Sequence, residues 1–460
     1  MNRRLGLADR LTPRVAVIGA GACGLTALKA IVDAGLPVQC FEKGDRVGGN
    51  WVFANNNGQS SAYRSLHINT SRPRMQFRDF PMPESYPDYP RHDLIAQYFD
   101  DYARAFELHR RIRFRTSVEH AEPRAGGGFR LTLDDGSSEE FDALIVANGH
   151  HWDPALPEPA IPGSFSGLEL HSHEYRDPDE PHALRGKRVL VVGMGNSAMD
   201  IACELGHPGV AEQVFLSARR GAWVLPKYAF GKPIDQGTLL PPFLPASIRR
   251  ALSELWYRLA VGRPEDFGLP KPDHHLDQAH PTMSSDLLTR LGSGDVRAKR
   301  GLSRLDGKRV HFDDGSVEEL DVIIYATGYK VTFPFFAPEF VSAKANDLPL
   351  FLRVFPFDRA DLAFIGLAQP VGAVMPLAEA QSKLVAELLS GTYDLPDAGE
   401  RQRHTQRARA EMFARYVPSR RHTMQLDYDD YMATLRRESE AGRKRARRRA
   451  ARSTTPVRQP

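Results

Sequence analysis

The first residues whose spacing could do chemistry are glycines near the N-terminus. Gly19, Gly21 and Gly24 follow the apolar run 15–18 and precede an apolar segment with helical spacing. The first glycine permits a tight turn, the second lets the backbone approach a pyrophosphate, and the third packs the helix against the strand. Glu42 ends the next predicted strand, where a carboxylate can bond the hydroxyls of a ribose. A solvated acid at a strand end is the alternative, but position and residue type both favour a dinucleotide site.

The same pattern returns in the second half of the chain. Gly193 and Gly195 follow the apolar run 189–192, and an alanine takes the place of the third glycine. The helix that begins here turns its N-terminus toward bound phosphates. Asn196 and Ser197 stand at the start of that helix and are the candidate binding residues of this second site.

The strand after the second glycine segment ends differently from the first. It is followed by Arg219 and Arg220 instead of an acid. A carboxylate there would repel a 2′-phosphate, whereas a guanidinium can bond it bidentately and stack on the adenine. The second site is therefore predicted to bind NADP rather than NAD. The alternative is that both arginines are solvated surface charge.

Two dinucleotide sites in one chain indicate one tightly held redox cofactor and one diffusible hydride donor. We assign FAD to the first site and NADPH to the second. Disulfide reductases of this arrangement need a redox-active cysteine pair, and Cys23, Cys40 and Cys203 show no Cys-x-x-Cys spacing. Disulfide reduction is therefore not expected.

An internal repeat indicates that duplicated elements position these sites. The glycine segments are 174 residues apart, and two Asp-Asp-Gly-Ser turns, at 134–137 and 313–316, are 179 residues apart. Each turn predicts a hairpin that feeds an apolar strand. The predicted fold class is α/β, with two tandem Rossmann-like dinucleotide-binding domains, the second inserted in the first. Proline-rich connectors set the boundaries, so we expect an FAD-binding domain at 1–162 and 326–440 and an NADP-binding domain at 163–325.

The charge of the chain is distributed unevenly. The whole sequence carries a formal net charge of +4, but eight basic residues follow the last acid, Glu440, so that the rest of the chain has a net charge of −4. An acidic body argues against nucleic-acid binding, apart from weak binding by the tail. The segment 441–460 lacks apolar periodicity, and we predict a disordered basic tail there.

The cysteine content and the hydropathy point to a compartment. Three cysteines without paired spacing suggest a reducing environment. The first residues lack the apolar stretch of a signal peptide, and no run approaches the roughly 18 apolar residues of a membrane span. We expect a cytoplasmic protein without a membrane span, and we leave open that it forms a homodimer.

The linker before the second glycine segment carries a recognisable motif. Phe165, Gly167, His171 and Tyr175 resemble the Phe-x-Gly-x-x-x-His-x-x-x-(Phe/Tyr) identifying sequence of flavin-containing monooxygenases, a branch of the class B flavoprotein monooxygenases. The related Baeyer–Villiger monooxygenases usually have Trp in place of Tyr175, which favours the flavin-containing branch. Other stretches that look similar to this family lie at 48–51, 69–71, 79–83, 149–151, 193–198 and 326–329.

This resemblance implies a reaction. NADPH would reduce FAD, the reduced flavin would capture O2 as a C4a-hydroperoxide, and the distal oxygen would pass to a soft nucleophile, an amine nitrogen or a sulfide sulfur. The small-molecule substrate and O2 are then the partners. Gly49 and Trp51 are carried over from the similar stretch 48–51 as FAD-binding residues. Baeyer–Villiger oxygenation of ketones, and an NADPH oxidase that releases hydrogen peroxide, remain the alternatives.

Asn69 is the catalytic residue that the resemblance suggests. In the family the matching asparagine lies near the flavin and the retained NADP, and an amide can donate and accept without supplying an acidic proton. Capping of a local turn is the alternative. His171 is interpreted as a neutral, hydrogen-bonded residue that holds the interdomain linker.

A histidine-rich stretch is the only pattern that suggests a metal. Asp273, His274 and His275 are followed by His280 within a proline-rich segment. Such a segment lacks the ordered scaffold that a metal site needs, so we predict a loop and no metal site.

Overall fold

The apolar runs around the first glycine segment form one parallel sheet. A computed structural model of the chain describes residues 12–237, 243–279, 282–417 and 423–453. The sheet has the order β23-β7-β1-β2-β3, and each of its neighbouring pairs is parallel. Its strands are β1 (Val15–Ile18), β2 (Val38–Phe41), β3 (Ile112–Arg113), β7 (Ala143–Val146) and β23 (Leu362–Phe364).

Both faces of this sheet are covered, which explains why its strands are continuously apolar. Val15 and Val17 face a core shared with α1 (Ala22–Asp33) and α7 (Val374–Leu389). Ala16 and Ile18 face a second core, shared with an antiparallel sheet. That sheet consists of β4 (Val118–Pro123), β5 (Phe129–Leu133) and β6 (Ser138–Phe141).

The second parallel sheet follows the same plan in the order β10-β21-β11-β12-β17. Helices α4 (Asn196–Leu205) and α6 (Leu287–Ser293) cover one face, and a smaller sheet covers the other. The parallel strands are β10 (Leu168–His171), β11 (Arg188–Val192), β12 (Gln213–Ser217), β17 (Val296–Lys299) and β21 (Val322–Tyr325). The covering strands are β9 (Gly163–Phe165), β18 (Leu302–Gly307), β19 (Arg309–Phe312) and β20 (Val317–Glu319).

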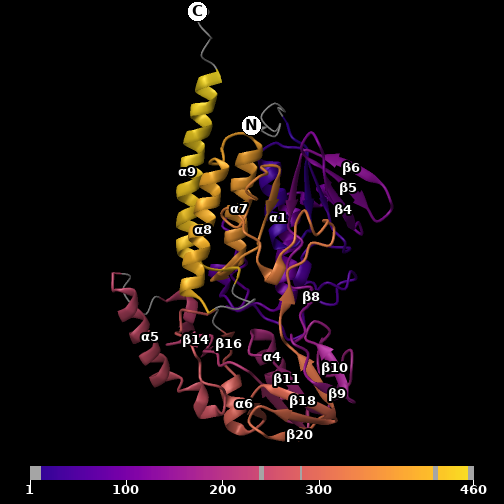
Figure 1. Ribbon diagram of the computed structural model, residues 1–460, viewed down its shortest axis with the longest axis vertical. Helices are drawn as coiled ribbons and strands as arrows, with labels where there is room; N and C mark the ends of the chain where they lie inside the picture. Colours follow the sequence, from indigo (N-terminus) through magenta and orange to yellow (C-terminus); the bar gives the residue numbers. More distant parts are fainter. Residues whose placement is uncertain (1–11, 238–242, 280–281, 418–422, 454–460) are drawn as a thin grey trace, which may run out of the picture.

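The chain order shows how the two sheets are connected. The strands of the second sheet all lie between β7 and β23 of the first, so the chain leaves the first sheet and returns to it. The two Asp-Asp-Gly-Ser turns join the hairpins β5–β6 and β19–β20. Figure 1 shows the first sheet with its helices in the upper part of the molecule and the second sheet in the lower part. The fold is mixed α/β with parallel sheets. We call the two parts the first and the second unit.

The C-terminal segment differs from the predicted tail. Helix α9 (Tyr428–Ser453) continues well past residue 441, so the prediction of disorder is wrong for 441–453, and residues 454–460 lie outside the described part of the chain. Arg443 pairs with Glu387 of α7, Arg449 pairs with Asp394, and Ala446 is buried. Two of the arginines that made this segment look disordered therefore bond carboxylates of the first unit.

The remaining elements connect the two units or lie on the surface. The helices are α2 (Arg72–Met75), α3 (His92–Ala105), α5 (Ala246–Ala260) and α8 (Ala398–Arg415). The short strands are β8 (Asp153–Pro154), β13 (Val224–Leu225), β14 (Tyr228–Ala229), β15 (Lys232–Pro233), β16 (Thr282–Met283), β22 (Tyr329–Lys330), β24 (Gln369–Val371) and β25 (Gln425–Asp427). The 3-10 turns are η1 (Gly49–Trp51), η2 (Leu108–Arg111), η3 (Ile234–Gln236), η4 (Pro264–Phe267) and η5 (Lys344–Asn346).

Candidate functional site

The first glycine segment forms a cradle with no room for side chains. Gly19 has φ +97°, and a Cβ there would lie 2.7 Å from the carbonyl oxygen of Ala147. A Cβ on Gly24 would overlap the carbonyl oxygen of Gly19. Helix α1 begins after Gly21 without a side-chain cap, which leaves its first N–H groups for an anionic ligand. This geometry fits the pyrophosphate of a dinucleotide.

The stretch 48–51 lies against this cradle. Gly48 and Gly49 have φ +124° and +55°, and a Cβ on Gly21 would lie 3.6 Å from the Cα of Gly49. Gly48 N–H donates to the Ala20 carbonyl at 3.1 Å. Trp51 is half-buried at the edge of the first core. The structure therefore brings Gly49 to the same place as the first glycine segment.

Glu42 is held at the end of β2 beside the cradle. Its side chain is buried, and its two carboxylate oxygens accept the N–H groups of Ala20 at 2.7 Å and Gly44 at 2.6 Å. Asn57, which the sequence did not single out, donates to the same carboxylate at 3.4 Å. Burial raises the pKa of Glu42, while the backbone N–H groups of Ala20 and Gly44 act to lower it. The carboxylate keeps lone pairs for a ribose hydroxyl.

The second glycine segment has a similar backbone geometry. It differs in that the first side chains of its helix bond other parts of the protein. Gly193 has φ +139°, and Gly195 precedes α4 without a side-chain cap. Asn196 uses its side-chain oxygen to accept the N–H of Met283 at 2.9 Å. The Ser197 hydroxyl bonds the phenol of Tyr63. Both predicted residues therefore also join neighbouring parts of the protein.

The two arginines after β12 are not equivalent. Arg220 pairs with Asp273 at 2.7 Å, whereas Arg219 makes no ion pair with any residue in the described ranges. Hydrogen bonds from His274 and Arg220 lower the pKa of Asp273, which keeps this pair charged. Arg219 is exposed and is therefore the guanidinium available to a phosphate.

Asn69 lies where the two units meet. Its side-chain oxygen is buried and has no hydrogen-bond partner among the described residues. The neighbouring backbone is held from the second unit: Lys227 Nζ donates to the Ile68 carbonyl at 3.4 Å, and Asp235 accepts the Ser71 N–H at 2.7 Å. An unpaired buried amide oxygen is costly unless a ligand bonds it. The site therefore fits a bound polar group.

Charged residues near Asn69 were missed by sequence reasoning. Burial lowers the pKa of Lys227, and the Asp200 carboxylate acts in the opposite direction. Burial raises the pKa of Asp200, whose oxygen accepts the Tyr63 hydroxyl at 2.5 Å. The Lys227 ammonium lies 5.0 Å from the ring centroid of Tyr89. No motif marks these residues, because they come from separate loops and a helix face.

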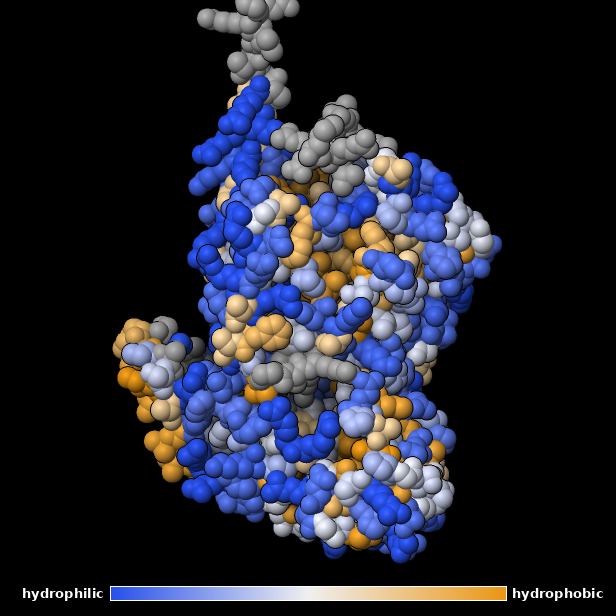
Figure 2. Space-filling view, viewed as in Figure 1, coloured by the Kyte–Doolittle hydropathy of each residue, from blue (hydrophilic) through white to orange (hydrophobic). Residues whose placement is uncertain are grey.

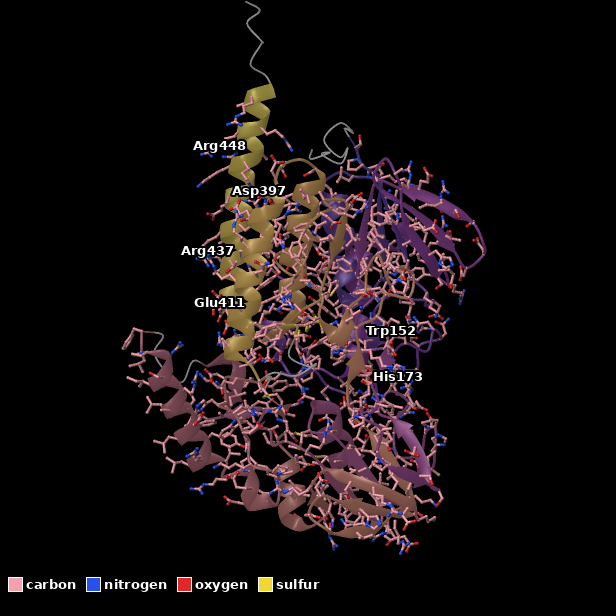
Figure 3. The ribbon with its side chains drawn as sticks, viewed as in Figure 1. Trp152, His173, Asp397, Glu411, Arg437 and Arg448 are labelled. Atoms are coloured by element: carbon pink, nitrogen blue, oxygen red, sulfur yellow. The ribbon has the colours of Figure 1, made fainter. Side chains whose placement is uncertain are left out.

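The motif histidine ends strand β10 of the second sheet. His171 is buried, and its Nδ1 accepts the N–H of His173 at 3.1 Å. Burial, and then the charge of His173, lowers the pKa of His171 to about 4, so the ring is neutral near pH 7. The ring lies 5.3 Å from that of Tyr329, in the returning linker strand β22. Figure 3 labels His173 and Trp152 in this region between the two units.

The histidine-rich stretch does not gather metal ligands. Asp273 pairs with Arg220, and His275 bonds Glu254 at 2.8 Å. Within the residues that the structure describes, no group of His, Cys, Asp and Glu could hold a metal ion. His280 lies outside those residues.

The hydropathy of the helices bears on membrane spanning. None of the helices in the described ranges is both long enough and apolar enough to cross a bilayer.

The chain is similar to known proteins over most of its length. The model of the flavin-binding monooxygenase-like family matches residues 12–444. Flavin-containing monooxygenase 5 of Rattus norvegicus is 38% identical over 442 residues, which cover 92% of this chain and 82% of the rat protein. The N-oxide-forming dimethylaniline monooxygenase 2 of Pan troglodytes is 35% identical over 446 residues, with the same coverage of 92% and 82%.

Solved structures are similar over most of the chain. The S-allyl-L-cysteine S-oxygenase of Allium sativum is 26% identical with a TM-score of 0.67, covering 93% of this chain and 89% of that one. An oxidized steroid monooxygenase bound to NADP is 18% identical with a TM-score of 0.69, covering 94% of this chain and 98% of that one. At this lower identity the similarity concerns the fold alone.

Proposed function

Because the chain belongs to the flavin-binding monooxygenase-like family, and is an FAD-dependent NADPH monooxygenase, we propose that it oxygenates a small soft nucleophile at an amine nitrogen or a sulfide sulfur. Such nucleophiles attack an electrophilic oxygen without prior deprotonation, so the protein needs no acid–base residue to activate them. The relatives named for N-oxide formation and S-oxygenation support this substrate class.

The two cofactors are assigned to the two units. FAD is placed at the first glycine segment, in a domain of residues 1–162 and 326–440, and NADP at the second, in a domain of residues 163–325; both are taken as Rossmann-like. When bound, these cofactors supply hydride transfer and the activation of O2. The cradle of Gly19, Gly21 and Gly49 would hold the FAD pyrophosphate, Glu42 its ribose, and Arg219 the NADP 2′-phosphate.

The observation that carries the proposal is the position of Asn69. Its buried, unpaired side-chain oxygen lies beside backbone groups that Lys227 and Asp235 of the second unit hold. A side chain positioned by both units lies between the two glycine segments along the chain, and its oxygen is open to a ligand that touches both units. The amide can hydrogen-bond a reactive oxygen there without donating an acidic proton, which protects it until substrate arrives.

The reaction is tested on the purified protein loaded with FAD. NADPH consumption, oxygenated product and hydrogen peroxide are measured with N,N-dimethylaniline, a dialkyl sulfide and a cyclic ketone. We expect product from the amine or the sulfide in proportion to NADPH consumed. Product from the ketone alone would show Baeyer–Villiger oxygenation, and hydrogen peroxide without product would show an NADPH oxidase; either result would refute the proposal.

The location and the assembly state are also proposals. We place the protein in the cytoplasm, which its three unpaired cysteines, Cys23, Cys40 and Cys203, support. A homodimer and weak binding of nucleic acid by the C-terminal basic residues stay as predictions, to be checked by light scattering and by a salt titration.

A further inference from the structure

Three buried oxygen atoms lack partners in the region where the two units meet. They are Oδ1 of Asn69, Oγ of Ser71 and Oδ1 of Asp235, and no described residue forms a hydrogen bond with any of them. Ser71 is fully buried, and its N–H donates to the other carboxylate oxygen of Asp235 at 2.7 Å. Asn69 precedes Ser71 by two residues. The three oxygens therefore lie in one neighbourhood, to which both units contribute.

These oxygens differ from those at the protein surface. Hydrophilic residues cover much of the face seen in Figure 2, where water can bond their polar atoms. The three oxygens at the junction are hidden from solvent. A buried acceptor without a donor destabilises a folded protein, so natural structures contain few of them. Three in one place indicate a site that a ligand completes.

The chemistry of the three atoms defines the ligand that fits them. The amide oxygen of Asn69 and the carboxylate oxygen of Asp235 can only accept hydrogen bonds, and the Ser71 hydroxyl can also accept them. Asp235 forms no ion pair within the ranges that the structure describes. Arg74 donates to the backbone carbonyl of Asp235 and not to its carboxylate. The set is therefore complementary to a positively charged group that donates a hydrogen bond.

The one lysine at this junction already has other partners. The Lys227 ammonium donates to the Ile68 carbonyl, lies 5.0 Å from the ring centroid of Tyr89, and is attracted by the Asp200 carboxylate. The charge of Asp235 acts on the same ring: burial, and then this charge, raises the pKa of the Tyr89 phenol. With Lys227 balanced by Asp200, the negative charge of Asp235 remains for a ligand.

We propose that Asp235 selects amines that arrive as ammonium ions. Its Oδ1 accepts the single N–H of a tertiary ammonium, while the oxygens of Asn69 and Ser71 face the positive charge. This selection rests on the proposed oxygenation of soft nucleophiles and narrows it, because a cationic alkylamine is then preferred over a neutral sulfide of the same shape.

The carboxylate also has a part in the reaction of such an amine. The nitrogen of an ammonium ion has no free electron pair, so its proton must leave before oxygenation. The N–H bond breaks, an O–H bond forms at Oδ1 of Asp235, and the electron pair stays on nitrogen. The proton returns to solvent after the product leaves. A sulfide or a free amine needs no such step.

The test uses the FAD-loaded full chain and three substrates of similar shape. N,N-dimethylbenzylamine is cationic near neutral pH, whereas N,N-dimethylaniline and benzyl methyl sulfide are neutral. Asp235→Asn keeps an oxygen for the Ser71 N–H but removes the charge. We expect the ratio of kcat/KM for the benzylamine to kcat/KM for the sulfide to fall by about 10- to 100-fold, because a hydrogen bond to a charged group is lost. The aniline should follow the sulfide.

A binding measurement makes the result independent of turnover. Benzyltrimethylammonium can neither lose a proton nor be oxygenated, and its Kd is obtained from the change in flavin fluorescence with NADP present. We expect this Kd to rise by roughly tenfold in Asp235→Asn, since the attraction to one partly buried charge is removed. If none of the three substrates is oxygenated, the proposed function fails, and this Kd still decides whether Asp235 recognises a cation.

Two further variants separate recognition from a general effect on the junction. Asp88→Asn changes another carboxylate that joins the units, through the Tyr228 hydroxyl at 3.0 Å, and should leave the substrate ratio and the Kd as they are. Ser71→Ala removes one unpaired oxygen and should lower the ratio by a few fold. FAD content and the thermal transition are compared for every variant.

Three results would overturn the selection by Asp235. An equal loss with all three substrates in Asp235→Asn would mean that the carboxylate only holds the Ser71 backbone. An unchanged ratio together with an unchanged Kd would mean that the charge is not used. A higher KM for NADPH with the ratio unchanged would mean that Asp235 faces the nucleotide instead of the substrate.

Discussion

Lys227 of the second unit places its ammonium nitrogen 3.4 Å from the carbonyl oxygen of Ile68 in the first unit. The contact fixes the backbone immediately before Asn69, and Asp235 fixes it again two residues later through the Ser71 N–H. The side chain of Asn69 is thus positioned by contacts that exist only when the two units are docked. A change of docking would move the backbone that carries this amide.

Replacing Asn69 by Asp tests the role of this amide at nearly constant volume. The carboxylate loses the N–H donors and places negative charge beside electron-rich groups, so we expect uncoupling. NADPH oxidation and hydrogen peroxide release should persist, while product per NADPH falls by roughly 10²–10³-fold, as for the loss of one preorganised donor. Product and NADPH are measured together in protein with unchanged FAD content. Asp can cap a turn just as Asn can. An unchanged ratio of product to NADPH consumed would therefore mean that Asn69 only caps its loop.

The two arginines after β12 should contribute differently to NADPH binding. Arg219 is free of ion pairs in the described ranges, whereas Arg220 is held by Asp273. Arg219→Ala should therefore raise the KM for NADPH by about 10- to 100-fold through the loss of charge-assisted hydrogen bonds, and leave the KM for NADH nearly unchanged. Arg220→Ala is the matched control and should raise the KM for NADPH by only a few fold. Equal effects of the two variants, or a preference for NADH in the unaltered protein, would contradict this assignment.

The sequence predicted the parts of the fold whose signals are local. The glycine segments, the apolar strands and the two Asp-Asp-Gly-Ser hairpins are set by backbone sterics and hydrophobic period, and each was confirmed. The chain was also expected to rejoin its first domain after residue 326, and it does so through β23, a strand beside β7 that was not itself predicted.

The rest of the site depends on distant parts of the chain. Nothing near Lys227 in the sequence indicates that it reaches Ile68, 159 residues away. Composition alone also misjudged 441–453, because Arg443 and Arg449 there bond Glu387 and Asp394, which precede them by about 55 residues. Ion pairs of this kind become predictable only when the packing of α9 on α7 is known.

Truncation separates the helical part of the C-terminus from the end of the chain. Removing 441–460 deletes buried Ala446 and the pairs that Arg443 and Arg449 form with the first unit. We expect this to lower the free energy of unfolding by on the order of 2 kcal/mol, a sum of one small burial and partly exposed ion pairs. Thermal unfolding followed by flavin release measures the change. Removing 454–460 alone is the control and should leave the transition in place, and identical transitions for both truncations would mean that α9 does not stabilise the first unit.

The neutral His171 should make stability depend on pH. In the unfolded chain a histidine has a pKa of about 6.5, and in the folded protein burial lowers the pKa of His171 to about 4. The unfolded state therefore binds the proton more readily, so the free energy of unfolding falls as the pH drops below about 6.5 and levels off below about 4. The loss at pH 5 is about 2 kcal/mol.

Comparing His171→Asn with the unaltered protein isolates this contribution. Asn keeps an oxygen that can accept the His173 N–H but does not titrate, so the loss of stability between pH 7 and pH 5 should shrink by about 2 kcal/mol. Denaturant midpoints at the two pH values give the measurement. His182→Asn is the control, because His182 is exposed and its replacement should leave the pH dependence as it is. If His171→Asn lost stability in parallel with the unaltered protein, the His171 ring would not be the group that resists protonation, and its place at the end of β10 would be structural through shape alone.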